Sequence, residues 1–208
     1  MSRLTWFLIP LILFLLLTVF LYNGLFSDPS ARESSLIENE FPAFSLPDLA
    51  DEAITHTNDI FDGQMTFVNV WGVWCVTCAI ELPYLTELSQ KGYRFVGLYY
   101  DQDLDPDFGS KTINRVRAEV IETTRRFGNP FAFNIFDVYR DTSLDLGVTG
   151  APETFLVDPA GVIRLHHLGD INERVWTGKF LPVIEAIQRE YPVLSQLSTE
   201  HQLTGLKQ

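Results

Sequence analysis

Cysteine and positive charge are both scarce in this sequence. Only two of the 208 residues are cysteines, and 15 Lys and Arg stand against 27 Asp and Glu, which gives a net charge of −12. Two cysteines are too few for a scaffold held together by disulfides. The shortage of positive charge argues against nucleic acid or anionic lipid headgroups as partners, because both require clustered cations. We therefore expect the two cysteines to serve through their reactivity.

The sequence begins with its longest apolar run. Residues 4–22 carry no charge and are dominated by Leu, Ile and Phe. As a helix they would extend roughly 28 Å, close to the thickness of the bilayer core, so we predict an uncleaved transmembrane anchor over residues 1–23. Arg3 would hold the N-terminus in the cytoplasm and leave the rest of the chain outside. A cleaved signal peptide is the alternative, although its apolar region would be shorter and residues 22–26 offer no small-x-small cleavage site.

The remaining sequence fits one domain with a tether and a tail. Residues 24–40 are polar and form the predicted tether, residues 41–192 the domain, and residues 193–208 a C-terminal tail. Short apolar runs alternate with helical periodicity in the domain, which predicts an α/β fold with a mixed central sheet flanked by helices. The expected strands cover residues 44–46, 54–56, 66–71, 93–100, 133–137, 153–158 and 162–168, and the expected helices cover residues 76–91, 110–127 and 173–190.

Residues 101–112 form an acidic stretch with the composition of a calcium-binding loop. Such a loop requires glycine at its sixth position and glutamate at its twelfth. Those positions hold Pro106 and Thr112, so we predict a solvated loop.

Both cysteines, Cys75 and Cys78, lie in one Cys-x-x-Cys motif. A β-rich run precedes the motif and a segment of helical period follows it. A strand, a tight turn with Cys-x-x-Cys and a helix are together typical of a thioredoxin-like redox site. Half of a zinc site and an inert structural bridge are the alternatives. Zinc requires four ligands and none of the four histidines accompanies a second cysteine pair, and a bridge closing so small a loop adds little stability.

The two sulfurs are expected to have different roles. Cys75 falls at the start of the predicted helix, where unpaired amides and the helix dipole stabilise a thiolate. Cys78 lies one turn further on and should be more buried. We therefore predict that Cys75 attacks a partner's disulfide and that Cys78 resolves the mixed disulfide.

Two segments resemble a known family. Residues 71–78 (WGVWCVTC) resemble the thioredoxin-superfamily active site, and residues 147–158 (GVTGAPETFLVD) are similar to the Gly-Val-x-Gly-x-Pro-Glu-Thr-Phe signature of the CcmG/DsbE branch. Those proteins are membrane-anchored thiol:disulfide interchange proteins of cytochrome c biogenesis. The resemblance implies a thioredoxin-like fold on the periplasmic side of the inner membrane, held by a single-pass anchor. It also implies a reductant that keeps the haem-attachment cysteines of apocytochrome c reduced, with no cofactor beyond the cysteine pair and a membrane thiol donor of the DsbD/CcdA type.

The resemblance further implies roles for residues around the cysteines. Pro152 matches the family's cis-proline, which faces the disulfide and leaves Ala151 able to pair with an extended substrate backbone. Trp74 is expected at the rim of the site, in contact with substrate. Glu81 and Glu153 match acidic positions that the family places around the active site, and Glu153 is expected to bind substrate together with Trp74, Ala151 and Pro152.

A further hypothesis concerns the proton of Cys78. Asn69 stands where ordinary thioredoxins keep a buried aspartate, and an amide cannot accept a proton. We therefore expect Glu81, assisted by Glu153, to deprotonate Cys78; the alternative is that Glu81 is a solvated helix residue. Negative charge beside the cysteines, with no cation between or directly after them, favours a reductant over an oxidant.

Two other functions remain open at this stage. One is a general periplasmic thiol reductase of the same fold, and the other is a copper metallochaperone. Copper delivery would require a wider cysteine spacing and a well-placed distal histidine. The adjacent His166 and His167 should point to opposite faces of their strand, which makes a shared metal difficult, and no metal site is predicted.

Overall fold

The computed structural model describes residues 3–25, 36–100 and 111–192. Contacts within the chain divide it into two units, residues 1–33 and residues 34–208. The first unit contains α1 (Arg3–Leu25), whose large apolar side chains between Ile9 and Tyr22 are exposed. Among the described residues, no helix combines the length and the apolar character that crossing a membrane requires, so the anchor expected over residues 1–23 stays a prediction.

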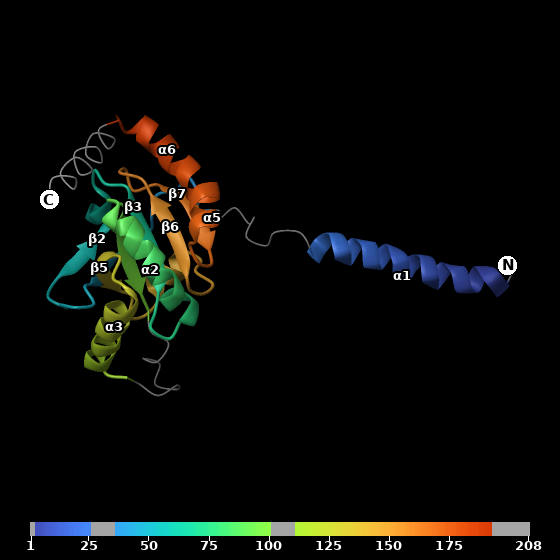
Figure 1. The fold of residues 1–208 in the computed structure, drawn as a ribbon, viewed down its shortest axis with the longest axis horizontal. Coiled ribbons are helices and arrows are strands. Elements are labelled where there is room, and N and C mark those ends of the chain that lie inside the picture. Colours follow the sequence, from blue (N-terminus) through green and yellow to red (C-terminus); the bar gives the residue numbers. More distant parts are fainter. Residues whose placement is uncertain (1–2, 26–35, 101–110, 193–208) are drawn as a thin grey trace. The chain divides into compact units, whose positions relative to one another are not determined.

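A five-stranded mixed sheet forms the centre of the second unit (Figure 1). The strand order is β5-β4-β3-β6-β7; β3, β4 and β5 are parallel, β6 is antiparallel to β3, and β7 is antiparallel to β6. The strands are β3 (Thr66–Trp71), β4 (Arg94–Tyr99), β5 (Phe131–Phe136), β6 (Glu153–Val157) and β7 (Ile163–Leu168). Every residue of the central strand β3 is buried, as expected for a strand that is covered on both faces.

Helices cover one face of this sheet. They are α2 (Val76–Gln90), α3 (Ile113–Phe127) and a C-terminal run of α5 (Glu173–Val175), the π-helical η4 (Trp176–Phe180) and α6 (Leu181–Glu190). Their apolar side chains form one core with Phe67 and Trp71 of β3. Because α2 and α3 both connect neighbouring parallel strands, right-handed crossovers place them on the same face.

The opposite face is covered by the segment around Phe41 and Phe44 and by two short helices, and the N-terminal hairpin ends beside the edge strand β5. These elements are β1 (Ser45–Pro47), β2 (Thr55–Thr57), η2 (Asn58–Phe61) and α4 (Asp141–Asp145). The strands β1 and β2 pair antiparallel. Phe41, Phe44 and Phe61 form an aromatic cluster, and Phe41 contacts Phe155 of β6.

The predicted α/β class and the mixed sheet are confirmed, and each predicted strand occurs within two residues of its expected boundaries. The sequence patterns did not predict η2 or α4. The expected helix over residues 173–190 is divided, with the π-helical turn ending two residues before Pro182, which has no N–H for the helical ladder. The tail and most of the tether and of the acidic loop lie outside the described residues, so these and the domain boundaries stay predictions.

Candidate active site

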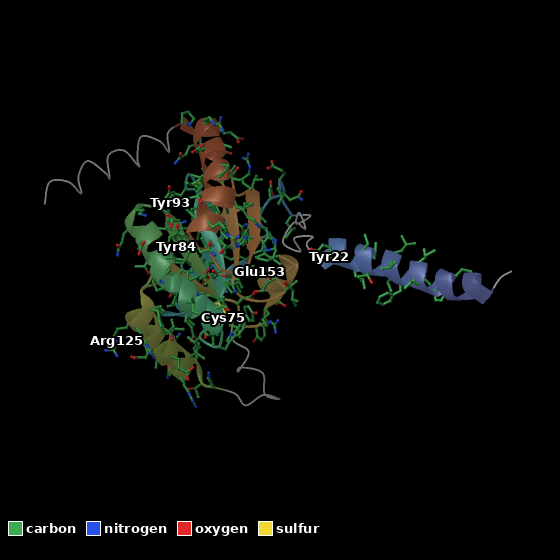
Figure 2. The ribbon with its side chains drawn as sticks, turned by 45° about the vertical axis from the view of Figure 1, so that its right-hand side comes forward. Tyr22, Cys75, Tyr84, Tyr93, Arg125 and Glu153 are labelled. Carbon is green, nitrogen blue, oxygen red and sulfur yellow. A yellow bond between two sulfur atoms is a disulfide. The ribbon has the colours of Figure 1, made fainter. Side chains whose placement is uncertain are left out.

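The cysteine motif lies where β3 ends and α2 begins. Cys75 is the N-cap residue of α2, and its N–H donates to the carbonyl of Gly72 at 3.1 Å, which closes the turn after Trp71. Cys75 and Cys78 form a disulfide, with their Cα atoms 5.3 Å apart (Figure 2). The strand, turn and helix predicted around the motif are confirmed.

The two sulfurs differ in exposure and in their contacts. Cys75 is 6% exposed and Cys78 is 0% exposed, so Cys78 is the more buried, as predicted. The backbone N–H of Cys78 donates to Sγ of Cys75 at 3.1 Å. Unpaired amides at a helix N-terminus stabilise negative charge. The helix therefore supports a thiolate on Cys75, the sulfur that a partner can reach more easily.

Glu81 is a buried carboxylate on the cysteine-bearing helix. It lies three residues after Cys78, on the same helical face, and is only 2% exposed. The side-chain amide of Asn69 donates to Oε1 at 3.0 Å, and the backbone N–H of Ile171 donates to Oε2 at 2.9 Å. The alternative that Glu81 is a solvated helix residue is wrong.

The environment of Glu81 changes its acidity. Burial is the largest influence and raises the pKa of Glu81 from 4.5 to about 7; the charge of Asp170 acts in the same direction, while the hydrogen bonds from Ile171 and Asn69 act against it. A carboxyl group with a pKa near neutrality can both accept and release a proton under physiological conditions.

A row of buried polar side chains crosses three strands on the face that α2 covers. Asn69 of β3 is the register partner of Thr154 of β6, and Thr154 is the register partner of His167 of β7. The Asn69 amide donates to Thr154 Oγ1 at 3.0 Å as well as to Glu81. Within the described residues, Asn69 Oδ1 and His167 Nδ1 are buried without a hydrogen-bond partner. Asn69 therefore holds the carboxylate as a donor and leaves Glu81 as the acid beside Cys78.

The loop before β6 lies against the disulfide. Sγ of Cys75 is 3.3 Å from the carbonyl oxygen of Ala151. The Ala151–Pro152 peptide bond is cis, and the N–H of Gly169 donates to the carbonyl of Pro152 at 2.9 Å. The structure thus brings Ala151 and Pro152 together with Cys75, as the family resemblance implied.

Glu153 lies on the opposite side of the sheet from Glu81. It alternates along β6 with Thr154, and its strand neighbour Phe155 belongs to the core on the face away from α2. Glu153 therefore cannot assist Glu81 in removing the proton of Cys78, and this part of the hypothesis is wrong. Both residues follow active-site motifs closely in sequence, but strand alternation separates their side chains.

The Glu153 carboxylate is bound on both oxygens instead. Oε1 accepts hydrogen bonds from the N–H and hydroxyl of Thr149, both at 2.8 Å, and from the N–H of Gly150 at 2.9 Å. Oε2 is 2.8 Å from Nε2 of His166. Burial alone would raise the pKa of Glu153, but these hydrogen bonds outweigh it and lower the pKa.

Trp74 is half-buried at the edge of the motif. Its Nε1–H donates to the carbonyl of Tyr100 at 3.0 Å, and the two rings pack with centroids 5.1 Å apart. The guanidinium of Arg140 lies over the Tyr100 ring, 4.8 Å from its centroid. Trp71, in contrast, is fully buried and belongs to the core. Trp74 is thus the tryptophan of the motif that lies at the surface.

Sequence reasoning did not identify the partners of the two carboxylates. Ile171 acts through its backbone N–H, for which a residue type gives no signal. Two of these partners carried a weak signal: Thr149 lies four residues before Glu153 in the segment that resembles the family signature, and His166 lies in the next expected strand. His166 and His167 point to opposite faces as predicted: His166 stacks on Phe155, and His167 packs edge-on against Phe180 of the helical face.

The chain matches the family model described as Redoxin over residues 37–179. It is also similar to several curated proteins named thiol:disulfide interchange protein DsbE. The protein from Yersinia pestis is 41% identical over 86% of this chain and 92% of its own length, and that from Escherichia coli K12 is 39% identical over 88% and 95%. The protein from Pseudomonas aeruginosa is 38% identical over 88% and 94%.

Solved structures support the fold assignment. A candidate DsbE from Chlorobium tepidum superimposes with a TM-score of 0.55 at 20% identity, covering 73% of this chain and 96% of the other. A secreted thiol-disulfide isomerase from Corynebacterium glutamicum gives a TM-score of 0.53 at 18% identity, covering 77% and 96%. Together with the family match, these similarities confirm that the α/β fold is thioredoxin-like.

Proposed function

Because the chain belongs to the DsbE family of thiol:disulfide interchange proteins, we propose that it is a reductant of cytochrome c maturation, keeping the haem-attachment cysteines of apocytochrome c reduced. Its chemistry is thiol:disulfide exchange by Cys75 and Cys78, which store two electrons without a cofactor. The observation that carries the proposal is the redox pair at the N-terminus of α2, enclosed by the loop at Ala151 and by the buried Glu81.

The reduction of a partner proceeds in two exchanges. The Cys75 thiolate attacks one sulfur of the partner's disulfide, which forms a mixed disulfide and releases the partner's other sulfur as a thiolate. The Cys78 thiolate then attacks Sγ of Cys75, which forms the internal disulfide and releases the second partner thiolate. The partner gains two electrons, and the protons that its thiolates take up balance those lost by the two cysteines.

Glu81 is the base for the second exchange. Cys78 is fully buried, so its proton cannot leave directly to water and requires an acceptor inside the protein. Glu81 is on the same helical face one turn away, and its pKa of about 7 leaves part of the population ionised at neutral pH. The donors Asn69 and Ile171 fix the carboxylate and so act as positioning groups.

The same carboxylate favours the reducing direction. An ionised group near the cysteines disfavours a thiolate, which destabilises the reduced form and lowers the reduction potential. Val76 and Thr77 between the cysteines and Ala79 after them supply no compensating cation. The protein therefore donates electrons more readily than it accepts them.

The substrate lies along the loop before β6. A partner sulfur that bonds to Cys75 brings its backbone beside Ala151, whose carbonyl is already 3.3 Å from Sγ. Ala151 and Pro152 bind this backbone, and Trp74 forms the rim on the other side of the motif. Glu153 is 2% exposed, so it contributes by holding the loop and makes no direct contact with substrate.

The N-terminal segment anchors the domain outside the cytoplasm. The proposal rests on the uncharged residues 4–22, on Arg3 before them and on the exposed apolar side chains of α1. The domain then faces the periplasm, where a membrane thiol donor of the DsbD/CcdA type re-reduces the disulfide. Extraction of membranes at alkaline pH tests the anchor: the full chain should stay with the membrane, and a variant lacking residues 1–23 should be released.

The substrate class can be tested by trapping. Cys78→Ser removes the resolving thiol, so mixed disulfides on Cys75 should accumulate in a c-type-cytochrome-producing bacterium and contain apocytochrome c. Cys75→Ser is the matched control and should trap no partner. Adducts with many unrelated periplasmic proteins would instead indicate a general thiol reductase, and a deletion strain that keeps its c-type cytochromes would refute the proposed role.

A further inference from the structure

Within the described part of the domain, one three-part arrangement of side chains occurs twice, once beside the active site and once away from it. His166 is 2.8 Å from Glu153 and stacks on Phe155 with centroids 4.1 Å apart. At the N-terminal hairpin, His56 is 3.0 Å from Asp48 and stacks on Phe133 at 4.0 Å. The proposed mechanism uses neither histidine.

The first arrangement is locked in position. His166 is on β7, directly opposite Phe155 of β6, and Glu153 is its diagonal neighbour across the pair. The His166 side chain is 7% exposed and the Glu153 side chain is 3% exposed. Stacking fixes the plane of the imidazole, so Nε2 is held toward Oε2 of the carboxylate.

The carboxylate transmits this constraint to the substrate-binding loop. Its second oxygen accepts three hydrogen bonds from Thr149 and Gly150, the two residues that precede Ala151. Ala151 in turn places its carbonyl 3.3 Å from Sγ of Cys75. A continuous series of contacts therefore runs from the outer strand β7 to the reactive sulfur.

We propose that His166 is a positioning residue for thiol:disulfide exchange. Through Glu153 it holds the 149–152 loop in the position at which the backbone of a substrate bound to Cys75 contacts this loop. The inference rests on the proposed function, since it assumes that a peptide disulfide is the substrate. His166 then affects how tightly the peptide backbone binds, whereas the exchange of sulfurs depends on the cysteines alone.

The physical reason is that the Glu153 carboxylate loses the hydrogen-bond partner of its Oε2 atom when His166 is replaced. If no donor faces Oε2, a buried carboxylate oxygen is left unpaired, which costs free energy unless the group rotates or takes up a proton. Either response changes the acceptor that Thr149 and Gly150 share. The loop then samples several positions, and a substrate backbone has to order it on binding.

Saturation kinetics with a peptide substrate test this inference. The full-length chain, reduced and freed of excess thiol, is mixed with increasing amounts of a synthetic peptide that contains an internal Cys-x-x-Cys disulfide, and single-turnover oxidation is followed. For His166→Phe, which keeps the stack and removes the donor, we expect the half-saturating peptide concentration to rise about tenfold, as for one lost hydrogen bond to a charged group. The limiting rate should change by less than about twofold, because the sulfur chemistry is intact.

Three further variants complete the test. His166→Gln retains a donor and should restore most of the affinity, while His56→Phe makes the same change in the remote arrangement and should leave the half-saturating concentration at the wild-type value. Thr149→Val removes one hydrogen bond from the other carboxylate oxygen at an exposed position, and a rise of about threefold is expected. It keeps the test valid should His166→Phe not fold.

The outcomes distinguish a failure of the role of His166 from a failure of the proposed function. Unchanged half-saturation in both His166→Phe and Thr149→Val, or an equal loss in His56→Phe, would overturn the role of His166. So would a loss confined to the limiting rate. If the wild-type chain itself does not reduce the peptide, the proposed function fails instead.

Discussion

Replacing Glu81 by glutamine removes the group that we expect to take the proton of Cys78, with little change in shape. Glutamine keeps one oxygen that can accept the hydrogen bond of Asn69 or of Ile171. The substitution therefore separates proton transfer from packing. Its predicted effect is confined to the second exchange, in which Cys78 displaces the partner from Cys75.

The expected magnitude follows from the acidity of Glu81. With a pKa of about 7, roughly nine-tenths of the carboxylates are ionised at pH 8 and roughly 3% at pH 5.5. A positioned base accelerates proton transfer by about 10²–10⁴-fold. At the lower end of that range, Glu81→Gln should slow the second exchange about 100-fold at pH 8 and only about fourfold at pH 5.5.

The two exchanges can be observed separately with an aromatic disulfide such as 5,5′-dithiobis(2-nitrobenzoate). The reduced chain releases one coloured thiolate when Cys75 attacks and a second when Cys78 resolves the adduct. Stopped-flow absorbance over a range of pH then gives both rate constants. In the wild type the second rate should rise with a midpoint near pH 7, and in Glu81→Gln this midpoint should disappear.

The chain provides a matched control for this substitution. Glu87 lies on the same helix but is exposed, so Glu87→Gln makes the same chemical change outside the site. Its rate constants should equal those of the wild type. A pH midpoint near 7 that survives in Glu81→Gln, or an equal slowing of both exchanges, would refute the assignment of Glu81 as the base.

Three further outcomes concern stability. Because burial raises the pKa of Glu81 to about 7 in the folded chain, the folded state binds this proton more tightly than the unfolded state. The free energy of unfolding should therefore fall as pH rises from about 4.5 to about 7, by up to about 3 kcal/mol in total, and urea unfolding of Glu81→Gln should lack that part of the pH dependence. Asn69→Leu removes the donor to Glu81 and should lower the free energy of unfolding by about 1–3 kcal/mol, measured by urea unfolding at pH 8. Arg164→Leu removes the guanidinium that lies 2.9 Å from the buried Asp158 carboxylate, and it should lower the free energy of unfolding by about 3 kcal/mol. As a control, Arg125→Leu breaks only an exposed ion pair and should change the free energy of unfolding by less than about 1 kcal/mol.

Local patterns were sufficient for the parts of the site that are close in sequence. The strand, the turn and the start of α2 around Cys75 are encoded in one short segment, and its hydrophobic run and spacing predicted all three. The placement of Glu81 on the face of Cys78 follows from helical periodicity alone. Its burial does not, because a glutamate on a helix is usually solvated, and the element that covers it comes from the other end of the chain.

Long-range contacts account for what the sequence did not predict. The N–H that binds Glu81 belongs to Ile171, 90 residues away, and a backbone group has no signature in the residue type. The pairing of Glu153 with Glu81 was a wrong prediction because it relied on closeness to the two motifs. Strand alternation in β6 decides the direction of Glu153, and the face could be assigned only once β6 was registered against β3.

The site is assembled from both ends of the domain, and this order has a consequence for biosynthesis. Cys75 is made early, whereas Ala151, Glu153 and Ile171 lie 76 or more residues further along the chain. In a chain still being synthesised, the two thiols therefore lack the loop at Ala151, and Glu81 lacks the N–H of Ile171. We therefore expect full reactivity only after β7 and the segment at Ile171 have docked, so that an unfinished or truncated molecule exchanges disulfides more slowly than the complete domain.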